Sequence, residues 1–400
     1  MKIHTSNVEK VKGMLEEANI PYRIEENYHK FDPLPTEHYF NLPEMKWSDD
    51  LKKRNVFLIK TDKDEELKQK LFTLFNIKPT RNNYFYYELE KDENEYEYEY
   101  TEKIKPKYPI YVITKGRWDK TYTIDTLEDM GVDFFICVEP NEYEKYIANP
   151  KVDKNKIIIL PENFSERGEG AVPVRNFVWE HSVQLGYKQH WQLDDNISWF
   201  FRWNDNKQIK VRDGVFFRIM EDFSERYENL GLTSCQYQSF VPAIDSSRQQ
   251  LIVNTRAYSC ILINTELLDK RLEERWRGRY NDDTDLTLRV LSTGDLCIVN
   301  FNSLLSGKMP SGSMKGGMAD MYKNHTHTGY GKKFDALKET WGDIIKLTNN
   351  RHKDGRPHHI IEYTKLFKQP LKFKEGIKKE PLINNYNMIL VNKGKKKKGK

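Results

Sequence analysis

Two adjacent carboxylates and an amide follow directly after an apolar segment of the chain. Asp194, Asp195 and Asn196 come after His190-Trp-Gln-Leu193, which has the composition of a buried strand. Hard divalent cations prefer such oxygen ligands and often share them with a phosphate group. Acids at a strand end also act as surface or capping groups. Two interpretations therefore stay open, a metal or ligand site and an ordinary polar turn.

A second group of acids precedes a segment with the apolar spacing of a helix, residues 286–291. The acids are Asp282, Asp283 and Asp285. Three arginines come just before them, Arg275, Arg277 and Arg279. Acids in the first turn of a helix are favoured by the helix dipole, which is one explanation. Because the cluster is larger than a cap requires, it can also hold a general base with its charge balanced.

Two other segments have compositions suited to phosphate groups. Arg167-Gly-Glu-Gly170 leads to Arg175 and Asn176 at the start of a predicted helix, where glycine allows close approach of the backbone and a helix N-terminus attracts anions. Residues 308–321 are rich in Gly, Ser and Met around Lys315. A mobile lid over a diphosphate and an ordinary surface loop both fit this composition. The histidine pairs 325/327 and 358/359 are more typical of surface or hydrogen-bonding groups than of a metal site.

Alternating strand and helix candidates position these groups between residues 107 and 330. The strand candidates are residues 108–113, 134–138, 157–160 and 190–193, and the helix candidates are residues 123–130, 142–147 and 173–186. Such alternation predicts an α/β domain with a doubly wound, mostly parallel sheet. Ligands of these sheets bind at the carboxyl ends of the strands, where residues 114–117 and 194–196 both lie.

Composition divides the chain into three predicted parts: an accessory α+β domain over residues 1–105, a catalytic-type α/β domain over 106–370 and a lysine-rich tail over 371–400. In the first part, residues 8–18 and 65–75 have helical spacing and 56–59 is a strand candidate. Glu95-Tyr-Glu-Tyr-Glu-Tyr100 alternates and predicts an exposed acidic strand or linker. The tail fits either a disordered solubilising end or an electrostatic contact with nucleic acid.

The composition excludes several classes of protein. Lys and Arg number 65 against 60 Asp and Glu, so a uniformly basic coat is excluded and any basic surface is local. The four cysteines form no CxxC pair, which argues against zinc ribbons and disulfide scaffolds and favours a reducing compartment. No apolar run approaches the roughly 20 residues of a membrane span, and no secretory signal is recognisable. We therefore expect a soluble, cytoplasmic protein.

Taken in order, these motifs resemble the TET-associated glycosyltransferases, a family found mainly in bacteriophages. The segments that carry the resemblance are residues 111–117, 167–176, 193–196, 254–260, 276–286 and 314–320. The resemblance covers about residues 107–365. It implies a GT-A fold, a nucleotide-diphosphate sugar such as a UDP-sugar as donor, and a hydroxymethylated pyrimidine in DNA as acceptor. For a phage-encoded chain, the compartment is the host cytoplasm.

The resemblance also implies a metal site. Asp194-Asp-Asn196 takes the place of the DxD motif, although the third residue is Asn rather than Asp. It implies Asp195 and Asn196 as ligands of Mn²⁺ or Mg²⁺, with Asp194 directed toward the ribose or sugar. Arg356-Pro-His-His359 is similar to a C-terminal Lys-Pro-Trp-His segment of some GT-A enzymes, which makes His359 a further candidate ligand.

The catalytic and donor-binding roles follow from the same resemblance. Asp282-Asp-Thr-Asp285 resembles the Glu-Asp-Asp-Asp stretch of inverting GT-A enzymes, which makes Asp283 the general base, with Asp282 and Asp285 in the same cluster. A retaining enzyme would not use Asp283 in this way, and the stereochemistry stays open. The donor-binding candidates are Thr114, Lys115, Arg117, Gly170, Arg175, Asn176, Asp194, Arg256 and Lys315.

The acceptor is less defined than the donor. Trp199, Phe200, Phe201 and Trp203 either stack on a flipped base or belong to the core. Basic residues nearby could contact phosphates: Arg202, Lys207, Lys210 and Arg212. Three other functions stay compatible: transfer to a protein or glycan, nucleic-acid binding without catalysis, and nucleotidyl transfer. The sequence does not define the sugar, the nucleotide, the modified base or the oligomeric state.

Overall fold

The computed structural model describes residues 1–5, 7–26, 55–61, 64–78, 84–87, 94–204, 207–241, 250–309, 315–317, 328–348, 358–377, 386 and 388–395. Several predictions fall outside these residues. They concern the histidines at 325 and 327, residues 310–314 and 318–321 of the predicted loop, Arg356 and the lysines after position 395.

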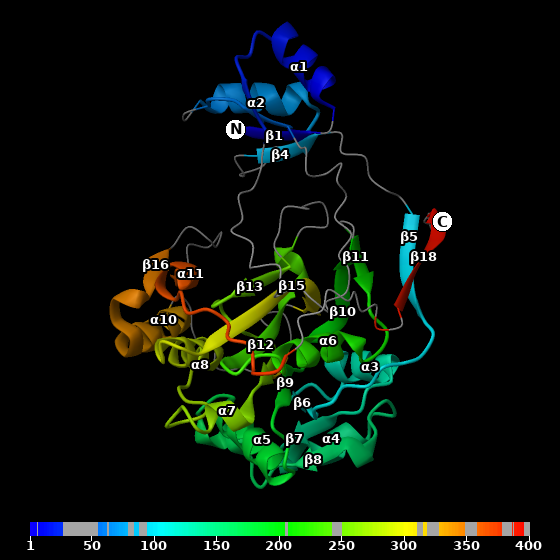
Figure 1. Cartoon of the computed structure of the whole chain (residues 1–400), viewed down its shortest axis with the longest axis vertical. Coiled ribbons are helices and arrows are strands. Elements are labelled where there is room, and N and C mark those ends of the chain that lie inside the picture. The colour runs from blue at the N-terminus through cyan, green and yellow to red at the C-terminus, as the bar shows by residue number, and fades with distance from the viewer. Residues whose placement is uncertain are drawn as a thin grey trace.

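A mixed sheet of ten described strands forms the centre of the molecule (Figure 1). In spatial order the strands are β11 (Lys207–Lys210), β10 (Ile197–Asn204), β15 (Cys297–Lys308), β12 (Leu230–Tyr237), β14 (Cys260–Ile263), β9 (His190–Asp194), β6 (Ile110–Ile113), β7 (Phe135–Val138) and β8 (Ile157–Ile159), and β13 (Leu251–Val253) pairs with β15. Strands β10, β13 and β14 run antiparallel to their neighbours, and the other seven described strands share one direction. The predicted mostly parallel sheet is confirmed and is compatible with a GT-A architecture.

The parallel part of the sheet is the part that the sequence predicted strand by strand. Strands β9, β6, β7 and β8 pair in parallel, as expected for short apolar runs buried on both faces. The predicted helices are present as α3 (Tyr122–Met130), α4 (Tyr143–Ile147) and α5 (Val172–Gln184). Helix α5 has Pro173 in its first turn and ends before Gly186, whose φ is +77°.

Helices cover both faces of this sheet because adjacent strand residues point to opposite sides. Ile110 and Val112 pack in one core with α3 and α6 (Val215–Ser224). Tyr111 and Cys137 pack in another core with α5. Helices α7 (Thr265–Leu268) and α8 (Asp282–Ser292) contribute to a third core together with β12, β14 and β15. The sheet is therefore doubly wound, as predicted.

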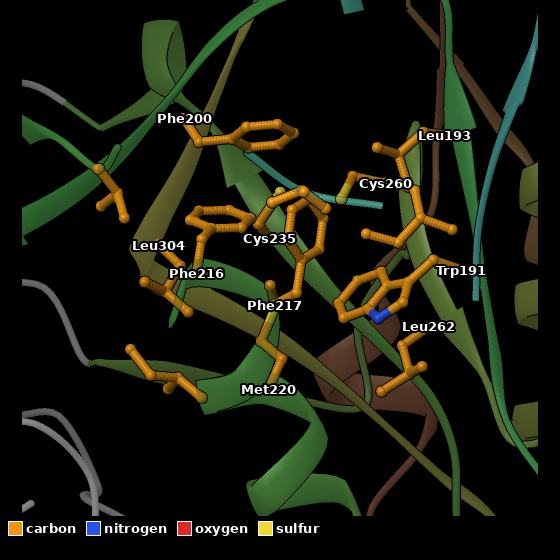
Figure 2. Close-up of a cluster of buried hydrophobic side chains, with 14 of the residues drawn as sticks. Trp191, Leu193, Phe200, Phe216, Phe217, Met220, Cys235, Cys260, Leu262 and Leu304 are labelled. Carbon is orange, nitrogen blue, oxygen red and sulfur yellow. The ribbon is translucent and has the colours of Figure 1, made fainter. Parts of the chain in front are cut away.

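Strand β10 begins directly after the Asp-Asp-Asn turn and was not predicted as a strand. Its Phe200 side chain is fully buried and lies 4.5 Å from Phe216 and 5.2 Å from Phe217 between ring centroids (Figure 2). Trp203 is also buried, whereas Trp199 and Phe201 are half-buried. The core interpretation is therefore correct for Phe200 and Trp203.

The N-terminal residues form a separate four-stranded sheet, in the order β2 (Arg23–Glu26), β3 (Asn55–Leu58), β1 (Lys2–Thr5) and β4 (Tyr84–Tyr87). Helices α1 (Val8–Glu17) and α2 (Glu65–Leu74) pack on it around a core of their own, which includes Val11, Phe57 and Leu71. The predicted helices and strand of this region are confirmed.

Strand β5 (Asn94–Tyr100) pairs with β18 (Met388–Lys395), so segments from opposite ends of the chain meet. The tyrosine side of β5 faces inward, with Tyr98 buried in the main core. The acidic side binds Lys393 Nζ, which lies 3.0 Å from Glu97 and 2.7 Å from Glu99. The predicted acidic strand is confirmed, and a strand occupies part of the predicted lysine-rich tail. The division of the chain at residues 105 and 370 stays a prediction.

The remaining elements follow the sheet in the chain. They are α10 (Thr328–Trp341), β16 (Lys346–Thr348), β17 (His358–Ile360) and α11 (Tyr363–Leu366), and β16 pairs with β17. Side chains of α8, α10 and the segment before α11 share a small core that includes Leu288, Leu337 and Ile345. None of the helices in the described ranges is long and apolar enough to cross a membrane.

Candidate active site

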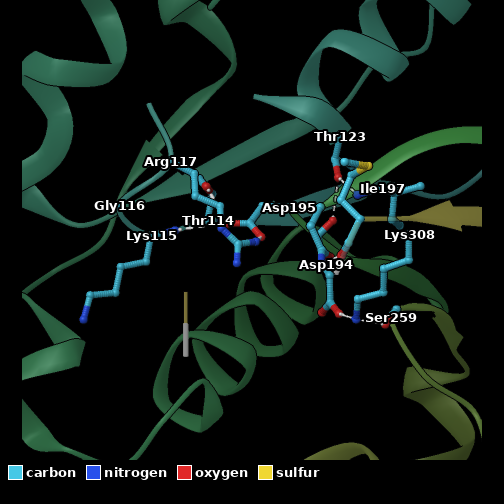
Figure 3. Close-up of polar contacts among 12 residues, drawn as sticks. Thr114, Lys115, Gly116, Arg117, Thr123, Asp194, Asp195, Ile197, Ser259 and Lys308 are labelled. Atoms are coloured by element: carbon cyan, nitrogen blue, oxygen red, sulfur yellow. Dashed lines mark hydrogen bonds and ion pairs between the residues drawn. The ribbon is translucent and has the colours of Figure 1, made fainter. Parts of the chain in front are cut away.

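Two strand ends lie side by side at one edge of the sheet. Strands β6 and β9 are parallel neighbours, with Ile113 opposite Asp194, so the residues after each strand meet. Thr123 of α3 fixes the second turn, since its hydroxyl donates to the Asp194 carbonyl at 2.7 Å and accepts from the Ile197 N–H at 2.9 Å (Figure 3). The predicted meeting of residues 114–117 with 194–196 is confirmed.

Asp195 is buried at this edge and is held by the β6 turn. Its carboxylate pairs with Arg117, accepts from Thr114 Oγ1 at 3.0 Å and lies 3.4 Å from the Lys115 N–H (Figure 3). Burial raises the pKa of Asp195 to about 6, although Arg117 opposes this shift. Arg117, expected at the nucleotide, thus binds a carboxylate in this structure, while the Lys115 side chain points away from Asp195.

Residues 315–317 lie across the β6 turn in very close backbone contact. The Gly317 N–H donates to the Lys115 carbonyl at 2.7 Å, and Arg117 Nε donates to the Lys315 carbonyl at 3.2 Å. A Cβ atom on Gly316 would lie 2.3 Å from the Lys115 oxygen, and Gly316 has a φ of +78°. Only glycine allows this approach. The Lys315 main chain therefore reaches the site, while its side chain is exposed.

Asp194 lies between two cations. Its carboxylate lies 3.1 Å from Arg175 Nη2 and 2.7 Å from Lys308 Nζ. Against the opposing effect of burial, Lys308 and Arg175 lower the pKa of Asp194. Lys308 Nζ also lies 2.6 Å from Ser259 Oγ (Figure 3) and 3.2 Å from Tyr237 Oη. The sequence reasoning missed Lys308, which ends β15 and stood at the start of the predicted loop.

Arg175 connects the strand end to helix α8. Besides Asp194, its guanidinium binds Asp282, with 2.7 Å between Nε and Oδ2, and it lies 4.6 Å above the Trp276 ring. Asn176 holds the same segment, because its amide exchanges two 2.9 Å hydrogen bonds with the Trp276 backbone. Arg175 therefore lies between the strand end and α8, and the Asn176 amide positions the chain before α8; their roles at the donor stay predictions. Gly170 has a φ of +73° in the turn before α5.

The three acids at the start of α8 have different surroundings. Asp283 pairs with Arg256 at 2.6 Å, and its other oxygen accepts from the Thr284 N–H at 2.7 Å. Burial acts to raise the pKa of Asp283, but the ion pair with Arg256 outweighs it and lowers this pKa to about 2. For Asp282 burial dominates and raises its pKa, although Arg175 opposes the shift.

Asp285 serves the structure of the domain and not the site. It is buried, and its carboxylate lies 3.1 Å from Arg277 Nε and 2.8 Å from Arg289 Nε. It also accepts from the Trp341 indole N–H at 2.9 Å. The geometry thus brings Asp282 and Asp283 to Arg175 and Arg256, and it commits Asp285 to linking α8 with α10.

The candidate metal ligands are distributed over two places. The Asn196 amide donates to the Met309 carbonyl at 2.7 Å and ties β9 to the end of β15. His359 lies beside Arg256, Lys333 and Asp283; burial and the two cations lower its pKa to about 3. The role of His359 as a metal ligand stays a prediction.

Asp194 and Asp195 are the carboxylates that remain for a cation. Within the described ranges, no group of three or more His, Cys, Asp or Glu side chains could hold a metal ion. Burial of Asp195 at a raised pKa means that its negative charge is incompletely compensated. The donor set therefore fits a divalent cation that takes most of its oxygen ligands from the substrate.

Comparison with known proteins gives one family for this region. The family model described as TET-Associated Glycosyltransferase matches residues 108–317, which is 210 of the 400 residues. The matched segment contains Arg117, Arg175, the Asp-Asp-Asn turn and the start of α8. Among curated proteins, no sequence matches the chain.

Proposed function

The chain belongs to the TET-associated glycosyltransferase family, and on this basis we propose that it moves a sugar from a nucleotide-diphosphate sugar to a 5-hydroxymethylpyrimidine base in DNA. The protein is a glycosyltransferase; donor, acceptor and metal are the proposed parts. One observation carries the proposal: Arg175 joins the Asp194 carboxylate at the strand end to the Asp282 carboxylate on α8. A donor group and a proton acceptor can thus be held a few ångströms apart.

The donor is proposed to bind at the ends of β6 and β9. The β6 turn, the overlying residues 315–317 and the cations Arg175 and Lys308 surround this edge. A Mn²⁺ or Mg²⁺ ion bound by Asp195 and Asp194 would neutralise the leaving diphosphate as a Lewis acid. Arg175 and Lys308 add fixed positive charge where the leaving group gains negative charge.

The acceptor hydroxyl is proposed to lose its proton to the Asp282–Asp283 pair. Both oxygens of Asp283, the base expected from the sequence, are engaged by Arg256 and the Thr284 N–H. With its pKa lowered to about 2, Asp283 is the weaker proton acceptor of the two. Burial raises the pKa of Asp282, which also shares Arg175 with Asp194. We therefore assign the base to Asp282 and the orientation of the pair to Asp283, a contribution on the order of 10²–10⁴-fold in rate.

A DNA acceptor is supported by a basic, aromatic edge of the sheet. Lys210 and Arg212 are exposed, and both lie over the half-buried Trp199 ring, at 4.2 and 5.5 Å from its centroid. Lys207 lies 4.4 Å from the Tyr96 ring. Cations beside aromatic rings are suited to phosphates and bases together.

The test is a transfer assay with purified protein and Mn²⁺. UDP-glucose and UDP-N-acetylglucosamine are supplied separately, with and without DNA that contains hydroxymethylcytosine. The DNA is then digested, and the masses of the nucleosides are measured by mass spectrometry. We expect a sugar mass on the base that is lost in EDTA and in Asp195→Ala, whereas Asp343→Ala, at a fully exposed aspartate, stays active. Nucleotide release without a modified base would refute the DNA acceptor and redirect the search to protein or glycan acceptors.

The base assignment has its own comparison. Asp282→Asn should abolish transfer with little change in the donor KM, because the isosteric amide cannot take the proton. Asp283→Asn should keep measurable transfer, since it removes an ion pair and not the base. An inactive Asp283→Asn enzyme beside an active Asp282→Asn enzyme would return the role to Asp283.

A further inference from the structure

A second polar cluster surrounds Asp283 and is built mainly by the C-terminal elements. Its members are Arg256 before β14, Lys333 on α10, His359 on β17 and Tyr363 at the start of α11. Three of these four residues lie outside the segment that matches the family. No donor contact or proton transfer described above accounts for Lys333 or Tyr363.

Two cations of the cluster lie close to Asp283. Arg256 binds its carboxylate at 2.6 Å, and Lys333 lies within the field of the same carboxylate. Asp282 also lies within the field of Lys333, but it pairs with Arg175 at 2.7 Å. His359 is neutral at ordinary pH, because burial and the two cations lower its pKa. An anion that enters this cluster therefore lies close to both cations, Arg256 and Lys333.

Two buried donors of the cluster lack an acceptor. Arg256 Nε and Tyr363 Oη are both buried and have no hydrogen-bond partner among the residues that the structure describes. A guanidinium always donates, and burial raises the pKa of the Tyr363 phenol, so that it also keeps its proton. Buried donors are costly to leave unpaired and are almost always satisfied in native proteins. Unpaired donors beside two cations indicate an anionic ligand with several acceptor oxygens.

We propose that Arg256, Lys333 and Tyr363 bind a phosphate group of the nucleic-acid acceptor, next to the nucleotide that receives the sugar. The planar Arg256 edge and the Lys333 point charge suit a phosphodiester, and the Tyr363 hydroxyl adds a neutral donor. This site rests on the proposed function and deepens it, because it names how the acceptor is held at the Asp282–Asp283 pair. The donor diphosphate has the same chemistry and is the other source of a phosphate.

The acceptor is the better source because of where the cluster lies. The proposed donor edge consists of the β6 and β9 ends with Arg175 and Lys308, whose ion pairs reach Asp194 and Asp282. The cluster instead pairs with Asp283 and comes from α10, β17 and α11. An enzyme that flips a base out of the stack needs contacts with the phosphates on either side of that nucleotide.

Tyr363→Phe and Lys333→Met test the site without touching the Asp282 carboxylate. Binding of a fluorescent oligonucleotide is measured by anisotropy over a range of salt concentrations, and KM is measured for donor and acceptor separately. Tyr363→Phe should weaken DNA binding about tenfold at an unchanged salt slope, because it removes a hydrogen bond and no charge. Lys333→Met should also lower the slope of log K against log[salt] by roughly 0.7–0.9, the value for one phosphate contact.

Matched substitutions at exposed positions serve as controls. Tyr187→Phe, at a tyrosine with 40% exposure, and Lys270→Met, at a lysine with 68% exposure, should leave DNA binding unchanged. A rise in the donor KM at constant DNA affinity would show that the cluster holds the donor diphosphate, and it would overturn the proposal. Unchanged values for both substrates in Tyr363→Phe and Lys333→Met would also overturn it.

A readout without activity separates this site from the proposed function. Melting temperatures are compared in inorganic phosphate and in chloride at equal ionic strength. If the wild type gains stability in phosphate and both variants lose this gain, the anion site stands, even for an enzyme that glycosylates no DNA. If the gain is equal in all proteins, the cluster binds no phosphate and the proposal fails.

Discussion

Replacement of Lys308 by methionine should destabilise the protein by about 2–3 kcal/mol, because it leaves the Asp194 carboxylate with one cation in place of two. Lys308 Nζ lies 2.7 Å from Asp194, and the two side chains are 22% and 25% exposed. Removing one partner of a buried pair costs about 3–5 kcal/mol. We expect a smaller loss, of about 2–3 kcal/mol, since the pair is partly exposed and Arg175 stays 3.1 Å from the other carboxylate oxygen.

Urea unfolding of four proteins isolates this interaction: wild type, Lys308→Met, Asp194→Asn and the double variant. The double variant should be more stable than the sum of the single changes predicts, with a coupling of about 1–3 kcal/mol. Lys270→Met is the control, because its partner Glu266 is 48% exposed and lies 3.2 Å away on the same turn. An exposed pair of this kind contributes below about 0.5 kcal/mol.

The effect of Lys308→Met should also depend on pH. Against the opposing effect of burial, Lys308 and Arg175 lower the pKa of Asp194 in the folded state. Its stabilisation is complete above the unfolded pKa of about 3.9 and is lost as the pH falls through the lower folded value. The gap between wild type and Lys308→Met should be full at neutral pH, begin to close below about pH 4 and disappear only below the folded pKa of Asp194. A gap that stays constant to low pH, or a coupling within about 0.5 kcal/mol of zero, would refute the reasoning.

Three further outcomes follow from the geometry. Gly316→Ala should abolish donor binding, measured by calorimetry, because its Cβ would meet the Lys115 carbonyl at 2.3 Å; Gly376→Ala, with a φ of +75° and open space around it, should cost only about 1 kcal/mol. Asp285→Asn should lower stability by about 3 kcal/mol while the kcat of the folded enzyme is kept, since its partners are structural; a large loss of kcat with normal stability would restore the catalytic role. Deletion of residues 388–400 should lower the melting temperature by uncovering Tyr98, whereas deletion of 396–400 should not.

The parallel half of the sheet was predictable because its strands are short apolar runs. Ile110–Ile113 and Phe135–Val138 are buried on both faces, so burial and composition agree. Parallel pairing then brings the ends of β6 and β9 together whatever the details of the loops. The meeting of the Thr114–Arg117 turn with Asp194–Asn196 follows from topology alone, and it was predicted for that reason.

The antiparallel half could not be predicted in the same way. Strand β15 is almost entirely buried yet carries several polar residues, including Asn300 and Ser306. The Asn300 amide is satisfied across the sheet, at 2.9 Å from Ser234 Oγ on β12. A strand whose polar groups find partners 66 residues away has no apolar run and no clean alternation. The sequence therefore predicted neither the end of β15 nor the place of Lys308 in the site.

The residue types of the site were predictable, but their partners were not. Arg175 was expected at the donor and is found between Asp194 and Asp282. Asp285 was grouped with Asp283 because they are two positions apart, a spacing that turns side chains to different sides of a helix. Ion pairs in this site span 19 to 114 residues of sequence, so only the folded chain selects among them.

The charges of the site argue for a cation that arrives with the donor. Four carboxylates, Asp194, Asp195, Asp282 and Asp283, are each paired with a cation from the set Arg117, Arg175, Arg256 and Lys308. This set is neutral as a whole, so a bare diphosphate would add uncompensated negative charge to a buried place. A diphosphate that carries Mg²⁺ or Mn²⁺ adds much less, and Asp195, whose pKa burial raises, is the proposed ligand of that metal. The donor affinity should therefore depend steeply on the divalent cation.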